Sequence, residues 1–359
     1  MDIQDTSNSN KRVLITGISG FLASRIALEL QNRNYLVRGT VRSKKDNKKM
    51  MFLKKMPQPD KIEICEADLL SDKGWDEAMK DCMFVLHVAS PFPISSPKNP
   101  DDLIKPAVEG TQRVLNAAKK NGIKKVVITS STAAIISADP SKIEMNEDCW
   151  SDVNVIPVYM KSKNLAEKAA WEFYKKQDPS SKMEVTVINP GLILGPSLIA
   201  TDFSSGELIR QMLMGIMPGV PDFMGQIVDV RDVAIAEVNA LEKPESNGKR
   251  FILVSSGMLM IEVANILREK YGKLGYKIPS NQFWNSTVWV ASIFSQDASD
   301  FYPFLGIHHK WHNEQSQQIL GIKYIPAKDS ILEMAKSLLE YGIVHDYEKN
   351  HSQVPKGCC

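Results

Sequence analysis

The chain has 359 residues, of which 43% are hydrophobic and 24% charged, and its formal net charge is +2. This composition indicates a folded protein with a sizeable core, and the near balance of charges argues against nucleic acid or an anionic membrane as a partner. No apolar run reaches the length of about 18 residues that a membrane span needs, and the polar first residues do not resemble a signal peptide. We therefore expect a cytoplasmic protein with one large α/β body and a smaller lobe.

The first predicted elements form a βαβ unit over residues 12–42. An apolar strand over residues 13–16 leads into a glycine turn, an amphipathic helix that ends near residue 31, and a second strand over residues 35–41. Gly17 allows a sharp turn, and Gly20 leaves room for a phosphate beside the backbone. The helix N-terminus attracts that anion. The spacing is GxxGxxA, with the small Ala23 where a third glycine often occurs. This unit predicts the phosphate-binding half of a dinucleotide fold.

The residues after the second strand indicate which dinucleotide binds. Nucleotide folds that hold NAD usually place an acid there for the ribose 2′-hydroxyl, whereas an arginine suits the 2′-phosphate of NADP. Here Arg42 is followed by Ser43, Lys44 and Lys45, and the first acid is Asp46. A solvated basic loop is the alternative interpretation. Because the basic residues follow a phosphate-binding turn, we predict NADP(H) as the cofactor.

Further along the chain, strands alternate with helices. We predict strands over residues 61–65, 83–88, 125–129 and 184–189, and helices over residues 44–56, 74–80, 103–121 and 157–177. Such alternation is typical of a parallel, doubly wound sheet with helices on both faces.

The pattern becomes irregular beyond Pro196, where we expect a smaller lobe over the carboxyl ends of the strands. Residues 203–219 and 281–312 lack sustained periodicity, whereas residues 227–241 and 250–254 are predicted to return to the main body and residues 330–341 to form a terminal helix. The predicted division is a flexible tail (1–10), a nucleotide-binding domain (11–196), a substrate lobe (197–345, with about 227–255 returning) and a second flexible tail (346–359). Eight aromatic residues of the lobe either line an apolar pocket or fill its core: Phe283, Trp284, Trp289, Phe294, Phe301, Tyr302, Phe304 and Trp311.

Two groups of possible metal ligands are interpreted as ordinary side chains. The run formed by His308, His309 and His312 has no further cysteine or carboxylate at a defined spacing, so we expect a solvated loop and no metal. The five cysteines show no metal-binding spacing and are expected to be reduced thiols: Cys65, Cys82, Cys149, Cys358 and Cys359. The last two leave a lipid modification open, although the C-terminus is not a CaaX box. His87, within an apolar strand, is expected to be a packed core histidine.

The candidate catalytic residues follow one strand and begin one helix. The strand over residues 125–129 ends in Ser130, Ser131 and Thr132 at the ligand-binding edge of the sheet. Tyr159 and Lys163 are four residues apart on a helix and so share a face. A free tyrosine titrates near ~10, and a neighbouring cation is expected to lower that pKa toward the working pH. The pair is therefore a candidate proton donor for carbonyl reduction.

Taken together, these motifs resemble the extended short-chain dehydrogenase/reductases. The chain is most similar to the group of dihydroflavonol, cinnamoyl-CoA and aldehyde (methylglyoxal) reductases within the NAD-dependent epimerase/dehydratase superfamily. The matching segments occur in the family's order: ITGISGFLAS (15–24), VRGTVRS (37–43), ADL (67–69), LHVASP (86–91), IKPAVEGT (104–111), VVITSSTAA (126–134), YMKSK (159–163), INPGLILGP (188–196) and VDVRDVA (228–234). The resemblance implies a Rossmann fold and an NADPH-dependent reductase of an aldehyde or ketone.

The resemblance also implies roles for individual residues. Ser131 would bind the substrate carbonyl, Tyr159 would protonate its oxygen, and Lys163 would lower the tyrosine pKa and hold the nicotinamide ribose. The pyrophosphate would be surrounded by Gly17, Ser19, Gly20, Phe21 and Leu22, and the 2′-phosphate would be held by Arg42 and Lys49. The adenine would lie beside Asp68 and Leu69. The nicotinamide end would be lined by Val88, Ala89, Ser90 and Pro190. Asp229, Arg231 and Asp232 are expected to hydrogen-bond loops beneath the site.

Two positions bear on the substrate. Dihydroflavonol reductases carry an asparagine where this chain has Ile136, which argues against a flavonoid, although Gln226 matches a substrate-side glutamine of those enzymes. A small carbonyl compound is the expected partner, and the oligomeric state is left open. Two other functions are considered: a nucleotide-sugar epimerase or dehydratase, which Arg42 argues against, and an inactive NADP-sensing protein, which would not need Tyr159 and Lys163.

Overall fold

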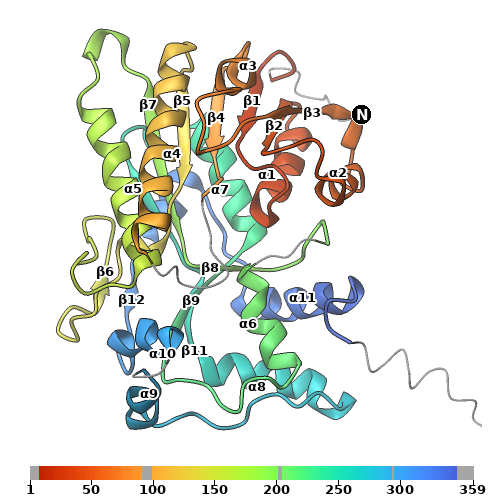
Figure 1. Cartoon of the computed structure of the whole chain (residues 1–359), viewed down its shortest axis with the longest axis vertical. Helices are drawn as coiled ribbons and strands as arrows, with labels where there is room; N and C mark the ends of the chain where they lie inside the picture. Colours follow the sequence, from red (N-terminus) through yellow and green to blue (C-terminus); the bar gives the residue numbers. More distant parts are fainter. Residues whose placement is uncertain (1–7, 91–98, 201–203, 293–294, 346–359) are drawn as a thin grey trace, which may run out of the picture.

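A seven-stranded parallel sheet forms the body of the protein, and a smaller lobe lies beyond one of its edges (Figure 1). The computed structural model describes residues 8–90, 99–200, 204–292 and 295–345. The predicted tails lie outside the described residues, apart from residues 8–10. The sheet confirms the predicted doubly wound α/β fold.

The strands of the main sheet follow the order β3-β2-β1-β4-β5-β7-β10. Every neighbouring pair is parallel. The strands are β1 (Arg12–Ile15), β2 (Leu36–Val41), β3 (Ile62–Glu66), β4 (Phe84–His87), β5 (Lys125–Thr129), β7 (Glu184–Pro190) and β10 (Arg250–Leu253). The chain order reverses beside β1, between β1 and β4, and ligands of such sheets bind at this kind of switch point.

Helices cover both faces of this sheet because its central strands are apolar on both sides. Leu14 and Ile15 of β1 and Val126 and Val127 of β5 are fully buried. Such continuous apolar runs are typical of parallel strands, and burial of each aliphatic side chain contributes about 1.5–3 kcal/mol.

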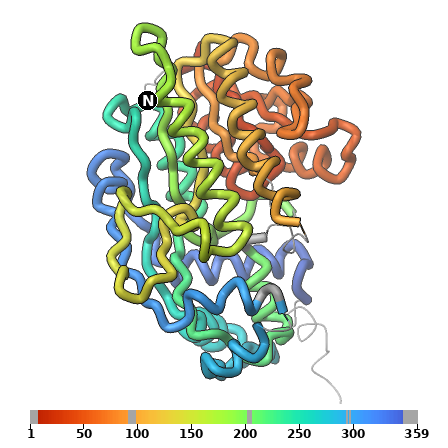
Figure 2. The backbone as a smooth tube through the Cα atoms, turned by 60° about the vertical axis from the view of Figure 1, so that its left-hand side comes forward, coloured from red at the N-terminus to blue at the C-terminus, as the bar shows by residue number. Residues whose placement is uncertain are grey.

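One face carries α1 (Phe21–Asn32) and α7 (Val230–Glu242), which pack against each other. The other face carries α4 (Asp101–Lys120) and α5 (Val158–Lys175), which run side by side in Figure 2 in orange and yellow-green. Two short helices complete this half of the chain, α2 (Asn47–Lys54) and α3 (Trp75–Met79).

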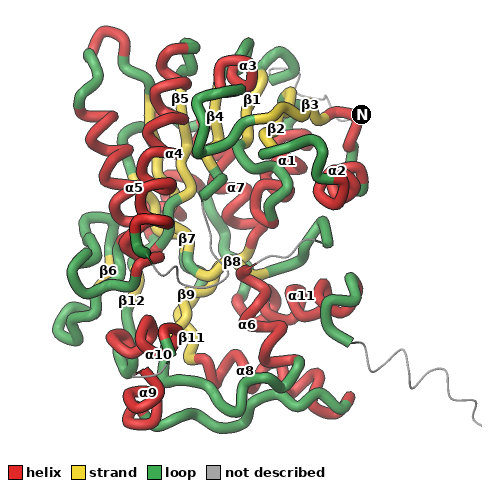
Figure 3. The backbone as a smooth tube through the Cα atoms, viewed as in Figure 1, coloured by secondary structure: helices red, strands yellow, loops and turns green. Residues whose placement is uncertain are grey.

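The lobe contains more regular structure than its sequence indicates (Figure 3). A three-stranded sheet in the order β11-β9-β8 joins β8 (Leu192–Leu194), β9 (Met224–Asp229) and β11 (Ser256–Leu259). A two-stranded sheet joins β6 (Glu144–Met145) to β12 (Lys310–Trp311). The helices are α6 (Ser204–Leu213), α8 (Met260–Tyr271), α9 (Asn285–Ser292), α10 (Gln296–Phe301) and α11 (Ala327–Glu340).

The segments predicted to return to the main body do so in part. Strand β10 joins the main sheet beside β7. Helix α7 packs against strands β5 and β7 of the same sheet. Strand β9, in contrast, pairs with β8 and β11 in the sheet of the lobe. A single chain passage therefore contributes to both sheets and connects the lobe to the body.

The aromatic residues of the lobe do not form one buried group. Phe304 is buried in a small core with Ile136 and Ile156, whereas Trp284 is 80% exposed. Three more aromatic side chains are also exposed: Trp289, Phe301 and Tyr302. Phe294 lies outside the described residues. Core filling thus accounts for Phe304, and most of the other predicted members lie at the surface.

Candidate active site

The sequence-predicted site residues converge at the carboxyl edge of the main sheet. Parallel strands end at the same edge, so the residues that follow them come together although they are far apart in the sequence. Gly17 follows β1, Arg42 follows β2, Asp68 follows β3, and Ser131 follows β5. The lobe lies beyond this edge in Figure 1.

The glycine turn after β1 has the geometry that its sequence predicts. Gly17 has a φ of +67°, and a Cβ there would lie 3.0 Å from the Cβ of Ala89. Its backbone N–H donates to Oγ1 of Thr40 at 3.0 Å, which ties the turn to β2. Both the backbone conformation and the close approach of Ala89 favour glycine at this position.

The N-terminal end of α1 can accommodate an anionic group. Gly20 is the N-cap residue, it is exposed, and no side chain in the described part of the chain caps this helix end. Phe21 and Leu22 bury their side chains in the core, and Ser19 is half-buried. Their backbone can therefore face a phosphate while the positive end of the helix dipole stabilises its charge.

A hydrogen-bonded histidine lies behind this turn. Oγ1 of Thr16 accepts from the backbone N–H of Ala89 at 2.9 Å and lies 3.0 Å from Nδ1 of His87. Burial, with a smaller effect of Lys163, lowers the pKa of His87 to about 3. His87 is therefore a neutral, packed core residue, as predicted. Val88, Ala89 and Ser90 continue the chain from β4 and are half-buried.

The basic residues after β2 differ in their surroundings. Arg42 is exposed directly beyond β2. Asp46 caps α2 by accepting from the backbone N–H of Lys49, and the ammonium of Lys49 lies 3.5 Å from the same carboxylate. That backbone hydrogen bond is the main cause that lowers the pKa of Asp46. Arg42 is therefore a better candidate for the 2′-phosphate than Lys49.

Asp68 and Leu69, which were predicted to flank the adenine, follow β3 and form a wall beside α4. The Asp68 carbonyl accepts from Nε1 of Trp75 at 3.1 Å, and its carboxylate accepts from the backbone N–H of Leu70 at 3.0 Å. A Cβ at Gly110 of α4 would lie 3.0 Å from the Cβ of Leu69. Gly110 thus lets α4 approach this wall closely, which the sequence analysis did not identify.

Ser131, Tyr159 and Lys163 lie at the same edge of the main sheet. Ser131 caps a short 3₁₀ helix (Thr132–Ala134), and its Oγ accepts from the backbone N–H of Ala133 at 3.1 Å. Hydrogen bonding by the same side chain acts to lower the pKa of Tyr159. Tyr159 is in the first turn of α5, and Lys163 follows one turn later with 9% of its surface exposed. The arrangement brings a serine hydroxyl, a phenol and an amine to one edge of the sheet.

The electrostatics of this group differ from the sequence-based expectation. Burial raises the pKa of Tyr159 to about 12, an effect that the hydrogen bond to Ser131 opposes. Burial lowers the pKa of Lys163 to about 8, although the nearby carboxylate of Glu167 acts to raise it. The net shift of the Tyr159 pKa is upward, because desolvation disfavours the charged phenolate. The phenol is therefore protonated at neutral pH and can act as an acid. The effect of Lys163 on the tyrosine pKa stays a prediction.

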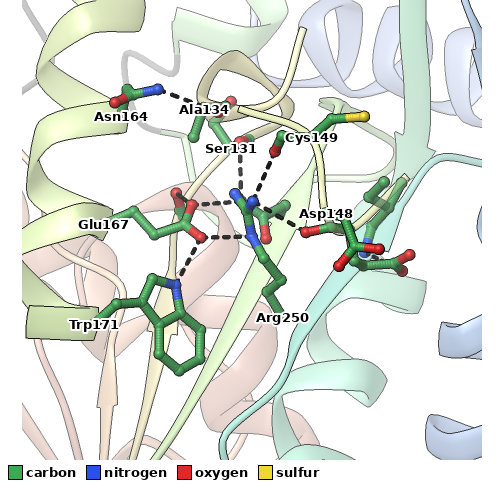
Figure 4. A network of polar contacts seen from close by, with 12 residues as sticks. Ser131, Ala134, Asp148, Cys149, Asn164, Glu167, Trp171 and Arg250 are labelled. Atoms are coloured by element: carbon green, nitrogen blue, oxygen red, sulfur yellow. Dashed lines mark hydrogen bonds and ion pairs between the residues drawn. The ribbon is translucent and has the colours of Figure 1, made fainter. Parts of the chain in front are cut away.

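The structure adds a residue that the sequence analysis missed, the buried carboxylate of Glu167. It lies one helical turn beyond Lys163 and faces Arg250 of β10 (Figure 4). The spacing of four residues from Lys163 was a signal, but the same spacing is common between exposed partners. Its burial depends on β10, which is distant in the sequence.

Three predicted residues remain, namely Pro190 on the nicotinamide side and Gln226 and Ile136 on the substrate side. Pro190 is buried at the end of β7. Nε2 of Gln226 donates to the Met224 carbonyl at 2.6 Å, and Ile136 is 2% exposed. The apolar Ile136 is part of a core cluster, so it offers no polar group to a ligand.

The other motifs have structural roles. His309 contacts the Ser137 carbonyl at 2.8 Å, while His312 contacts Glu144 at 2.5 Å, so the two side chains have different partners. Within the described ranges, no three histidine, cysteine or acidic residues form a metal-binding group. Cys65, Cys82 and Cys149 are free thiols.

Of the acidic pair at the start of α7, Asp232 hydrogen-bonds a loop as predicted, whereas the partners of Asp229 lie on helices α7 and α11. Asp229 caps α7, contacts the Arg231 guanidinium at 2.8 Å and accepts from Ser330 at 2.7 Å. Asp232 accepts from the backbone N–H of Ile325 at 2.8 Å. Burial raises the pKa of Asp232 to about 6. Both carboxylates thus have structural partners.

Comparison with known proteins places these features in one family. The model of the NAD dependent epimerase/dehydratase family matches residues 13–254. Cinnamoyl-CoA reductase 1 of Petunia hybrida is 32% identical over 343 residues, which cover 94% of each chain. Yeast methylglyoxal/isovaleraldehyde reductase Gre2, solved with NADPH, is 29% identical with a TM-score of 0.76 and covers 92% of this chain and 99% of its own. Gre2 of Candida albicans with NADPH is 28% identical with a TM-score of 0.75, covering 94% and 100%.

Proposed function

The chain belongs to the NAD dependent epimerase/dehydratase family, and from this premise we propose that it is an NADPH-dependent reductase of an aldehyde or a ketone. The comparisons confirm the predicted family and the predicted class of enzyme, an oxidoreductase. The observation that carries the proposal is the placement of Ser131 after β5 and of Tyr159 and Lys163 one turn apart on α5, at the same sheet edge as the glycine turn.

The cofactor fits the residues at this edge. The backbone around Gly17 and Gly20 would hold the pyrophosphate at the start of α1, and Arg42 would bind the 2′-phosphate. Leu69 and Asp68 would flank the adenine, and residues 88–90 with Pro190 would enclose the nicotinamide end. NADPH supplies the hydride from its nicotinamide C4. NADPH-bound structures of two reductases with the same fold support this choice of cofactor.

The protein supplies the proton and the orientation. Ser131 would donate a hydrogen bond to the carbonyl oxygen of the substrate. Tyr159, protonated at neutral pH because burial raises its pKa to about 12, would transfer its proton to that oxygen as negative charge develops there. Lys163 would stabilise the phenolate left behind, since an ammonium favours the charged form of a neighbouring phenol.

Two other functions fit the observations less well. Nucleotide-sugar epimerases keep NAD and favour an acid after the second strand, whereas Arg42 follows β2 here. An inactive cofactor sensor would not require a serine, a tyrosine and a lysine brought together at the cofactor edge. The relatives named above are reductases, which favours the same choice.

The lobe is the proposed source of substrate selectivity. Residues 11–196 would bind the cofactor, and residues 197–345, with the segment near 227–255 returning to the body, would enclose a small carbonyl compound. Ile136, a buried apolar residue of the nucleotide-binding domain, offers no amide to a flavonoid and so favours an aldehyde or a simple ketone. In the described part of the chain, no helix has the length and apolar character of a membrane span. We place the enzyme in the cytoplasm, without nucleic acid partners.

The test is oxidation of NADPH by the purified protein with a panel of carbonyl compounds. The panel contains methylglyoxal, aliphatic and aromatic aldehydes, a diketone, a dihydroflavonol and a cinnamoyl-CoA, each repeated with NADH. Tyr159→Phe should lower kcat by about 10²–10⁴-fold, the usual contribution of general acid catalysis, while NADPH still binds. Tyr174→Phe, on the same helix and away from the sheet edge, is the matched control. Full activity of Tyr159→Phe would remove this residue from the mechanism.

A further inference from the structure

Glu167 is a fully buried carboxylate on α5, one helical turn beyond Lys163. Its side chain is 0% exposed, and the mechanism above does not use it. A buried charge is costly unless it is paired and hydrogen-bonded. Its contacts therefore indicate what the position is built to do.

One oxygen of this carboxylate holds the ends of two strands. Oε2 accepts from Oγ of Ser130 at 2.6 Å and from Nδ2 of Asn189 at 2.7 Å. The same amide of Asn189 donates to the backbone carbonyl of Ser131 at 3.1 Å. Glu167 thus fixes the main chain on both sides of Ser131.

The other oxygen is tied to the edge of the sheet. Oε1 accepts from Nε1 of Trp171 at 3.1 Å and forms an ion pair with Nε of Arg250 at 2.8 Å (Figure 4). Arg250 is itself buried and donates to the carbonyls of Glu147 and Cys149. Its guanidinium also stacks on Trp150, with the guanidinium carbon 3.9 Å from the ring centroid. Glu167 therefore has a rigid, buried counter-ion.

Glu167 is also the anion that acts on Lys163. Both line a small cavity of about 20 Å³, enough for one water, together with His87. The neighbouring elements place no further charge at this cavity. Helix α4 supplies the uncharged Ala107 and Thr111, and His87 of β4 is neutral. Across the sheet, the carboxyl of Glu237 on α7 accepts from the Thr129 hydroxyl. Glu147 is the further acid near Arg250.

We propose that Glu167, with Arg250 as its buried counter-ion, is a positioning residue that orients the Ser131 main chain and keeps Lys163 in its ammonium form. It acts through Ser130, Asn189 and Lys163, and it touches neither substrate nor cofactor. The inference rests on the catalytic roles proposed above for Ser131, Tyr159 and Lys163.

The pH dependence of turnover separates this role from a purely structural one. Lys163, with a pKa near 8, loses its proton before Tyr159 as the pH rises, so kcat for reduction should fall on the alkaline side as Lys163 becomes neutral. Glu167→Gln removes the charge that favours the ammonium. The fall of kcat at alkaline pH (the alkaline limb of the pH–kcat profile) should therefore move to lower pH by about 1–3 units, the usual effect of one close opposite charge.

Three further variants complete the experiment. Glu167→Asp keeps the charge and should retain a limb close to that of the wild type. Glu172→Gln makes the same change on the same helix at a side chain that is 68% exposed, and it should leave the limb in place. Because Glu167→Gln leaves Arg250 buried without its partner, Glu167→Gln/Arg250→Met removes both charges and should show the same shift in a folded protein.

An unshifted limb in both Glu167→Gln and the double variant, with only the melting temperature lowered, would overturn the inference and leave Glu167 a structural residue. That outcome does not affect the proposed function. Full activity of Tyr159→Phe, in contrast, would defeat the proposed function whatever the limb does. The two failures are therefore distinguishable.

Discussion

Glu237 lies fully buried on α7, beneath the main sheet, and Glu237→Gln should change how stability depends on pH. The Thr129 hydroxyl donates to its Oε1 at 2.5 Å, and within the described residues its Oε2 has no hydrogen-bond partner. Burial raises the pKa of this carboxyl from 4.5 to about 8, so it is protonated in the folded protein at neutral pH. Glutamine has the same shape and cannot ionise.

The sign and size of the effect follow from the two pKa values. Between pH 4.5 and 8, the folded protein keeps the Glu237 proton that the unfolded chain has lost, so the free energy of unfolding falls as the pH rises. The loss is about 1.4 kcal/mol per pH unit and reaches about 3 kcal/mol at pH 7. Glu237→Gln should therefore stabilise the protein by roughly this amount at pH 7 and by almost nothing near pH 4.

Urea unfolding of both proteins between pH 4 and pH 8 measures this difference directly. Glu269→Gln is the control, since that carboxylate is 73% exposed and has only a surface partner, Lys328. Its difference from the wild type should stay small and constant with pH. A Glu237→Gln protein whose unfolding free energy runs parallel to that of the wild type over the whole range would show that Glu237 does not stay protonated inside the fold.

Two further substitutions test the cofactor site. Arg42→Asp should lower the ratio of kcat/KM with NADPH to that with NADH by at least about tenfold, because it removes a charge–charge contact to the 2′-phosphate; the same change at exposed Lys54 is the control, and an unchanged ratio would place the 2′-phosphate elsewhere. Gly17→Ala should weaken NADPH binding in a fluorescence titration by about tenfold, since an alanine at φ +67° costs about 1–2 kcal/mol and its Cβ meets Ala89 at 3.0 Å. Gly122→Ala, with a similar φ of +69° and nothing within 4 Å, precedes β5 at the opposite end of the strand and should leave NADPH affinity unchanged. Equal affinities of the two variants would show that the turn at Gly17 does not contribute to NADPH binding.

Local patterns predict the nucleotide-binding half well. The apolar strand, the glycine turn and the following helix lie within about thirty residues, and β5 occupies the predicted residues 125–129. Ser131, Tyr159 and Lys163 were predictable because strand ends and helix spacing place them at one edge. These features depend on neighbours in the sequence and on the shared direction of parallel strands.

The lobe was less predictable because its structure depends on distant pairings. Strand β8 has three residues and strand β11 four, and each is stabilised by β9 rather than by its own sequence pattern. Helix α8 (Met260–Tyr271) was not predicted, although it has regular helical spacing, because it directly follows β11. Gly39 is a similar case: its missing side chain makes room for Ile18, a contact that only the folded turn reveals.

The electrostatics of the site were the least predictable part. The motif pointed to a lowered pKa for Tyr159, whereas burial raises that pKa and hydrogen bonding by Ser131 opposes the increase only in part. The importance of Glu167 likewise depends on Arg250, a residue from another region of the chain. A sequence motif names the groups that meet, but their pKa values depend on how much water the fold removes.

The ion pair between Glu167 and Arg250 has a consequence for the synthesis of the protein on the ribosome. Chains begin to fold from their N-terminus as they emerge, and α5 leaves the ribosome well before β10. Until Arg250 arrives, the carboxylate of Glu167 lacks the buried guanidinium that pairs with its Oε1. The glycine turn can form early, whereas the proton-donating group matures only when the last strand of the main sheet docks. A nascent chain that ends before Arg250 should therefore lack the organised Ser131, however completely its first βαβ unit has folded.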